Sequence, residues 1–158
     1  MERRRNMLKY TDFDIVFQEI PDEVTLAINI SNCPCGCAGC HSPQLANDIG
    51  DALTEQVIDA LLDKYGAAVT CVCLMGGDAD PAAVNALAAH IRLKGKKSAW
   101  YSGRAALPEI IDMEHFDFIK LGPYIAECGG LKSPETNQRL FRIEQGQMHD
   151  ITCRFWKK

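Results

Sequence analysis

Four stretches of this chain carry apolar residues in patterns typical of β-strands. Residues 24–30 (VTLAINI) alternate and are rich in β-branched side chains, which predicts a strand. Residues 68–75 (AVTCVCLM) are apolar on both faces, as in a strand that is buried between two layers of a parallel sheet. Two shorter apolar runs predict further strands at about residues 98–101 and 116–121.

Between the predicted strands, apolar residues recur with helical spacing. The first helix begins after Thr54, a good N-cap, and ends at Gly66. The second begins at Asp80, which fits an N-cap followed by proline at the first helical position, and runs to Gly95. A third, short helix is predicted after Leu107. The apolar positions behind the first two predictions are Val57, Ile58, Leu61 and Leu62, then Val84, Leu87, Ala88 and Ile91.

Strands that alternate with helices predict an α/β fold with a curved, mostly parallel sheet and flanking helices. The 158 residues are too few for a closed eight-fold barrel of about 250 residues, so a partial (β/α) barrel is expected. The chain has no repeat, linker or composition shift, which favours a single domain over residues 1–158. Residues 1–12 are expected to form a flexible or peripheral N-terminus.

The segments that follow the predicted strands carry most of the polar and glycine residues of interest. In parallel sheets, reactive groups gather at the C-terminal ends of the strands. These segments, at residues 33–40, 76–78, 102–103 and 121–122, should therefore lie along one edge of the sheet.

Charge and hydropathy indicate which classes of partner this protein is not expected to have. The net charge of −4 argues against broad binding to phosphate backbones, so no nucleic-acid partner is expected. The N-terminus lacks the apolar run of a signal peptide and no window reaches transmembrane length, so we expect a cytoplasmic protein without a membrane partner.

A chain of this length with 47% hydrophobic residues buries a sizeable core and needs no disulfide bonds to hold it together. Chemistry or packing therefore explains the eight cysteines better than a disulfide framework does.

Half of the cysteines lie in one short stretch, residues 31–41 (SNCPCGCAGCH). Cys33, Cys37 and Cys40 have the spacing C-x3-C-x2-C, and three thiolates so spaced can hold three corners of a four-iron cluster, which leaves one iron open. A closed zinc or iron–sulfur site that also uses Cys35 is the alternative, although structural zinc sites usually draw ligand pairs from two separated segments. Four unligated thiols are a third interpretation.

The positions of the remaining cysteines do not indicate a second cluster. Cys71 and Cys73 share one face of an apolar strand and are expected to behave as small core residues. Cys128 and Cys153 lie far apart in the sequence.

Together, the C-x3-C-x2-C loop after the first strand, the Gly76-Gly77-Asp78 turn after the second and TNQRLFRI near the end resemble the radical S-adenosylmethionine (SAM) enzymes. They are most similar to the activating proteins of anaerobic ribonucleoside-triphosphate reductase. The resemblance covers residues 13–156 and includes glycine before the last cysteine of the loop. It also includes WYSG at 100–103, GPYI at 122–125 and KSPETNQR at 132–139.

The resemblance implies a specific chemistry. Cys33, Cys37 and Cys40 would hold a [4Fe–4S] cluster, and SAM would chelate the open iron through its amino and carboxylate groups. An electron from a flavodoxin-like donor would cleave SAM to methionine and a 5′-deoxyadenosyl radical. That radical would take a hydrogen atom from a glycine of the partner reductase and leave a glycyl radical.

The resemblance also implies roles for individual residues. Asp78, with the backbone of Gly76 and Gly77, would contact the amino group of SAM, and Ser102 would reach its carboxylate or ribose. The backbone of His41 would lie against the adenine. A further set of residues, implied to bind the partner or to close over the site, is Asn137, Gln138 and Arg139.

Two positions depart from the family pattern. The family usually has aspartate before the glycine that follows the fourth strand, whereas this chain has Leu121 preceded by Lys120. Lys120 either takes over the SAM carboxylate or is a surface lysine. Arg104 stands where the family often has an aromatic residue. Activation of another glycyl-radical enzyme, of the pyruvate formate-lyase type, and a closed four-cysteine zinc or electron-transfer module remain alternative functions.

Overall fold

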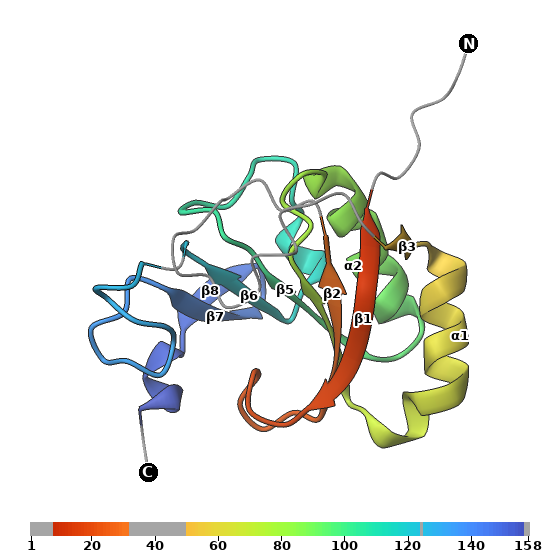
Figure 1. Ribbon diagram of the computed structural model, residues 1–158, viewed down its shortest axis with the longest axis horizontal. Helices are drawn as coiled ribbons and strands as arrows, with labels where there is room; N and C mark the ends of the chain where they lie inside the picture. The colour runs from red at the N-terminus through yellow and green to blue at the C-terminus, as the bar shows by residue number, and fades with distance from the viewer. Residues whose placement is uncertain (1–7, 32–49, 124, 157–158) are drawn as a thin grey trace.

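The computed structural model describes residues 8–31, 50–123 and 125–156 of the chain (Figure 1). The strands are β1 (Lys9–Val16), β2 (Thr25–Ile30), β3 (Asp51–Ala52), β4 (Cys71–Met75), β5 (Lys97–Tyr101), β6 (Phe118–Leu121), β7 (Arg139–Glu144) and β8 (Gln147–Asp150). The α-helices are α1 (Glu55–Tyr65) and α2 (Pro81–Leu93). Short 3-10 helices lie at Gly66–Ala68, Met113–His115 and Thr152–Phe155.

The strands form one mixed sheet with the order β3-β1-β2-β4-β5-β6-β7-β8. Its centre, β2-β4-β5-β6, is parallel, because α2 and other crossover connections return the chain to the same edge. The outer pairs are antiparallel. The predicted α/β class and its parallel core are therefore confirmed, and the order is that of an open sheet.

The antiparallel strands at the two sides were not among the predicted elements. β1 (KYTDFDIV) mixes charged and apolar residues, and none of its side chains is fully buried, so its pattern is weak. Residues 9–12, expected in a flexible or peripheral N-terminus, belong to this strand, in which Tyr10 pairs with both Ile30 and Asp51. β7 and β8 form a hairpin whose turn includes Gln145 and Gly146, both at positive φ.

The helix boundaries follow the predicted caps closely. The Thr54 hydroxyl accepts a hydrogen bond from the Val57 N–H at 3.3 Å, and the Asp80 carboxylate accepts one from the Ala83 N–H at 3.3 Å. The short helix predicted after Leu107 is instead a single 3-10 turn at Met113–His115.

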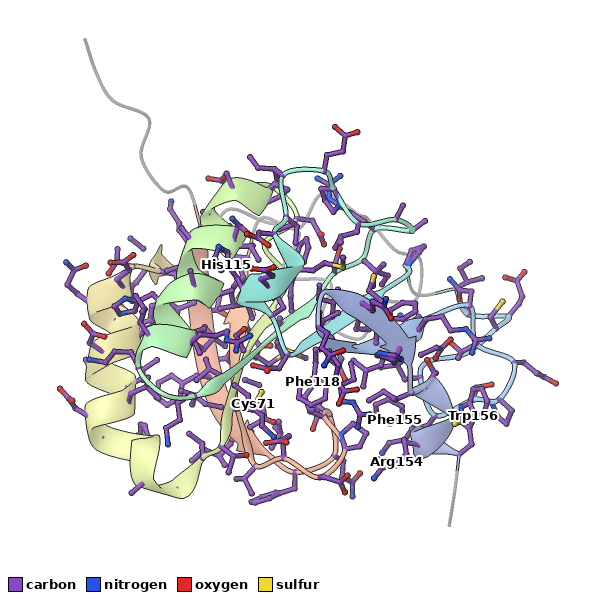
Figure 2. All side chains as sticks on the ribbon, turned by 180° about the vertical axis from the view of Figure 1, so that it is seen from behind. Cys71, His115, Phe118, Arg154, Phe155 and Trp156 are labelled. Atoms are coloured by element: carbon purple, nitrogen blue, oxygen red, sulfur yellow. The ribbon has the colours of Figure 1, made fainter. Side chains whose placement is uncertain are left out.

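Among the described residues, two hydrophobic clusters fill the two faces of the sheet. The larger contains Leu26, Ile28, Val72, Leu74 and Trp100 from the strands together with the buried faces of both helices. The smaller contains Ile20, Cys71, Cys73, Ala99, Phe118 and Leu140, with Phe155 packed against it. Figure 2 labels Cys71, Phe118 and Phe155 of this second cluster. Both helices therefore cover the same face, and the buried thiols of β4 lie on the other, which confirms their prediction as core residues.

No helix within the described ranges is both long enough and apolar enough to cross a lipid bilayer.

Candidate functional site

The turns that follow β4, β5 and β6 meet at one edge of the sheet. The Ser102 hydroxyl donates to Asp78 Oδ1 at 2.5 Å, and the Gly103 N–H donates to Asp78 Oδ2 at 2.9 Å. The Lys120 ammonium donates to the carbonyl oxygens of Ser102, at 3.0 Å, and Gly122, at 2.8 Å. We call this set of turns, residues 76–78, 102–104 and 120–122, the rim. The predicted meeting of these three segments is confirmed.

Gly76 of the rim packs closely against the end of β2. Its φ is +112°, and a Cβ at this position would lie 3.1 Å from the carbonyl oxygen of Ile30, the last residue of that strand. A side chain would therefore be both strained and crowded. Gly77 is more restrictive, because at φ +95° its Cβ would lie 2.6 Å from Val84 Cγ2 of α2. Glycine is thus required at both positions of the turn after β4, which lies between the end of β2 and the start of α2.

The predicted ligands Cys33, Cys37 and Cys40, together with His41, lie outside the described residues. The described chain does fix both ends of their segment. Ser31, directly after β2, is buried and donates its N–H to the Lys9 carbonyl at 2.9 Å. At the other end, Gly50 lies so close to Tyr10 of β1 that a Cβ would be 2.2 Å from the Tyr10 carbonyl oxygen. Ser31 and Gly50, the described residues on either side of this segment, therefore lie beside neighbouring residues of β1.

Asp78 is the electrostatic centre of the rim. Its side chain is 1% exposed, and Arg104 reaches back from the turn after β5 to compensate its charge. Arg104 Nη2 donates to the Asp78 carbonyl at 2.7 Å, and Nε lies 3.5 Å from Asp78 Oδ1. The carboxylate therefore joins the turn after β4 to the turn after β5.

Ser102 is committed to the same network. Its hydroxyl has one proton, which it donates to Asp78, and its oxygen accepts the Arg104 N–H at 3.0 Å. Ser102 is fully buried. In this arrangement it orients Asp78 and holds the turn, and it has no second proton for a ligand.

Lys120 is buried, with 7% of its surface exposed, and is therefore no surface lysine. Besides its two carbonyl partners, its ammonium lies 5.9 Å from the centre of the Tyr101 ring, in a cation–π arrangement. Lys120 thus fixes the turn after β6 against the turn after β5.

The loop before β7 closes the far side of the rim. The Gln138 side-chain amide donates to the Gly122 carbonyl at 3.5 Å, and the Asn137 amide donates to the Pro123 carbonyl at 3.0 Å. Asn137 Oδ1 is buried and accepts no hydrogen bond from the described part of the chain. Arg139 is different: its side chain pairs with Asp150 at 3.6 Å and lies over the Trp156 ring. The structure therefore brings Asn137 and Gln138, but not the Arg139 side chain, to the predicted site.

Behind the rim, the ionisable groups of the second cluster are held in their neutral forms. Burial raises the pKa of the Cys71 thiol to about 12 and that of Cys73 well above its usual value. Burial likewise raises the pKa of Tyr101, whose hydroxyl donates to the Glu19 carbonyl. Burial and the raised pKa values disfavour the thiolate form that metal ligation or nucleophilic attack requires.

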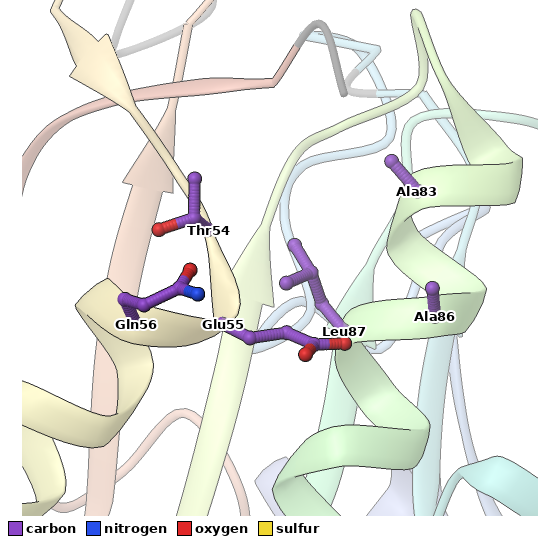
Figure 3. A pocket seen from close by; sticks show the side chains of 6 residues that line it. All are labelled: Thr54, Glu55, Gln56, Ala83, Ala86 and Leu87. Atoms are coloured by element: carbon purple, nitrogen blue, oxygen red, sulfur yellow. The ribbon is translucent and has the colours of Figure 1, made fainter. Parts of the chain in front are cut away.

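A separate groove of about 260 Å³ lies between the first turns of α1 and α2 (Figure 3). Its lining residues are Thr54, Glu55, Gln56, Ala83, Ala86 and Leu87. None of the predicted site residues within the described ranges lines it, so we do not connect it with the rim.

The charges of the rim suit a ligand that carries both an amino group and a carboxylate. Asp78 contributes one negative charge, while Arg104 and Lys120 contribute two positive charges. The carbonyl oxygens of residues 76–78 each accept one hydrogen bond from another described residue, and each has a second lone pair that can accept from an ammonium group. The methionine part of SAM has this combination of groups, so the described residues fit it. Sequence reasoning noted Arg104 only as a departure, because no spacing rule indicates that its side chain reaches Asp78.

Comparisons with protein-family models, with curated proteins and with solved structures found no match to this chain.

Proposed function

We propose that this protein is a radical SAM activating enzyme that generates a glycyl radical on anaerobic ribonucleoside-triphosphate reductase. One observation carries the proposal. The segment with the C-x3-C-x2-C spacing leaves the sheet directly after β2, and Gly76 of the rim packs against the last carbonyl of that strand. The proposed cluster ligands, Cys33, Cys37 and Cys40, thus follow in the sequence a strand whose last residue lies against a polar rim with charges that suit SAM.

When bound, the cluster and SAM would supply one-electron reductive cleavage, with the electron from a flavodoxin-like donor, and hydrogen-atom abstraction from a glycine of the partner. The residues of this chain have the task of binding and orienting SAM. The carbonyl oxygens of Gly76, Gly77 and Asp78 each accept one hydrogen bond from another described residue, and their second lone pairs are proposed to accept from its amino group. Ser102 and Lys120 keep the adjoining turns in position, and Asn137 and Gln138 cover the site on the side of β7. The backbone of His41 is proposed to contact the adenine, and Arg139 to face the partner.

The proposed function is tested by mixing the protein with its proposed partner. The protein is reconstituted anaerobically with iron and sulfide, then incubated with SAM, reduced flavodoxin and the reductase. A doublet glycyl-radical signal in the electron paramagnetic resonance spectrum, dependent on SAM, is expected. A reductase in which the acceptor glycine is replaced by alanine provides the matched control and should give no doublet.

Two other outcomes would contradict the proposal in different ways. A doublet on a pyruvate formate-lyase, and none on the reductase, would indicate an activase with a different partner. Stoichiometric zinc uptake without formation of 5′-deoxyadenosine would indicate a closed four-cysteine module.

A further inference from the structure

Arg104 is the rim cation with hydrogen-bond donors to spare. Its guanidinium has five N–H groups, of which one donates to the Asp78 carbonyl and the one on Nε faces Asp78 Oδ1. The Nη1 group contacts no acceptor among the described residues, and the side chain is 41% exposed. One edge of the guanidinium is thus held by Asp78 while the other is open to solvent.

The other candidates for binding an anion at the rim are already engaged. Ser102 gives its single proton to Asp78. Lys120 is buried, and its ammonium donates to two carbonyl oxygens that hold the turns together. With one carboxylate and two cations, the rim has a net positive charge. Arg104 is therefore the group best suited to meet an incoming carboxylate.

We infer that Arg104, in addition to the open iron, binds the carboxylate of SAM and so adds to the selectivity of the site for SAM over analogues that lack this group. The inference rests on the proposed function. Asp78 and the Arg104 backbone, which accepts the Gly122 N–H at 2.6 Å, orient the guanidinium in advance. Little side-chain entropy is then lost on binding, and the planar fork can donate two parallel hydrogen bonds to a carboxylate.

The test compares SAM with decarboxylated SAM, which keeps the adenosine, the sulfonium and the amino group. Equilibrium dialysis with the anaerobically reconstituted protein gives the dissociation constant of each compound for the wild type, Arg104→Gln and Arg104→Lys. Arg104→Gln should weaken SAM binding by about tenfold, equivalent to about 1.4 kcal/mol, and change binding of the decarboxylated compound by less than about twofold. Arg104→Lys should recover part of the loss, because it keeps the charge but not the fork.

Arg92, near the C-terminal end of α2 and away from the rim, provides a matched control. It is 44% exposed, lies 3.8 Å from Asp117, and donates to the Glu114 carbonyl at 3.0 Å, an arrangement close to that of Arg104. Arg92→Gln should leave both dissociation constants unchanged. Thermal unfolding of each variant separates a loss of binding from a loss of structure.

The inference is wrong if Arg104→Gln binds SAM as the wild type does, or if it weakens both compounds equally. In either case a wild type that still cleaves SAM would leave the proposed function standing. A wild type that binds no SAM would instead contradict the proposed function and this inference together. An acidic side chain of the partner is the other source of a carboxylate. Weaker binding of the reductase to Arg104→Gln, with unchanged selectivity between the two small molecules, would assign Arg104 to that role and overturn the inference.

Discussion

The stability of the rim is predicted to depend on Asp78. Replacing it with alanine leaves the Ser102 hydroxyl and the Gly103 N–H without their acceptor. It also removes the carboxylate that faces Arg104. Each buried donor left unsatisfied costs about 1–3 kcal/mol. The ion pair adds less than about 1 kcal/mol, because the arginine is 41% exposed and water screens it.

Asp78→Ala should therefore lower the free energy of unfolding by about 3 kcal/mol, with some relief from rotation of the Ser102 hydroxyl. Asp78→Asn keeps one acceptor but turns an N–H₂ group toward a donor, so about half of that loss is expected. Asp80 is the matched control. It is also buried, but its carboxylate caps α2 through the Ala83 N–H, and Asp80→Ala should cost about 1 kcal/mol.

Urea unfolding of the reduced protein, followed by circular dichroism, measures these differences. The m-value must stay constant for the comparison to hold. If Asp78→Ala costs no more than Asp80→Ala, the carboxylate does not join the two turns as argued.

Two further predictions concern the backbone of the rim and the pairing of the helices. Gly77→Ala should cost at least about 2 kcal/mol more than Gly95→Ala in urea unfolding, since both have positive φ but only the Cβ at residue 77 would contact Val84. Equal costs would show that the turn relaxes. The hydrogen bond from His90 lowers the pKa of Asp59 from its usual value. A carboxylate whose pKa is lowered by folding stabilises the protein above its unfolded pKa, and this stabilisation is lost as the pH falls through the folded value. The stability difference between wild type and Asp59→Asn should therefore shrink below about pH 4, and a difference that persists unchanged at lower pH would contradict this.

The sequence predicts the centre of this fold well, because buried parallel strands and capped helices have strong local signals. The β4 segment is apolar on both faces, and Thr54 and Asp80 cap their helices as expected. The edge strands have weaker signals. β1 is stabilised by pairing with β2 and β3 rather than by a buried face of its own, so its residues do not form a recognisable pattern.

The sequence predicts which segments form the candidate site, but not the contacts that their side chains make. The order of strands and turns is sufficient to bring Gly76, Asp78 and Ser102 to one edge. Which partner each side chain selects depends on three-dimensional packing. The reach of Arg104 to Asp78 and the burial of Lys120 therefore had no sequence signal.

The central claim is that Cys33, Cys37 and Cys40 hold an open cluster that cleaves SAM, and that Cys35 is dispensable. It is tested most directly by the yield of 5′-deoxyadenosine from anaerobically reconstituted protein, SAM and dithionite, measured for the wild type and for four single cysteine-to-alanine variants. We predict product from the wild type and from Cys35→Ala, and none from the other three variants. A wild type that forms no 5′-deoxyadenosine would contradict the enzyme assignment, and a folded but inactive Cys35→Ala would contradict the choice of ligands.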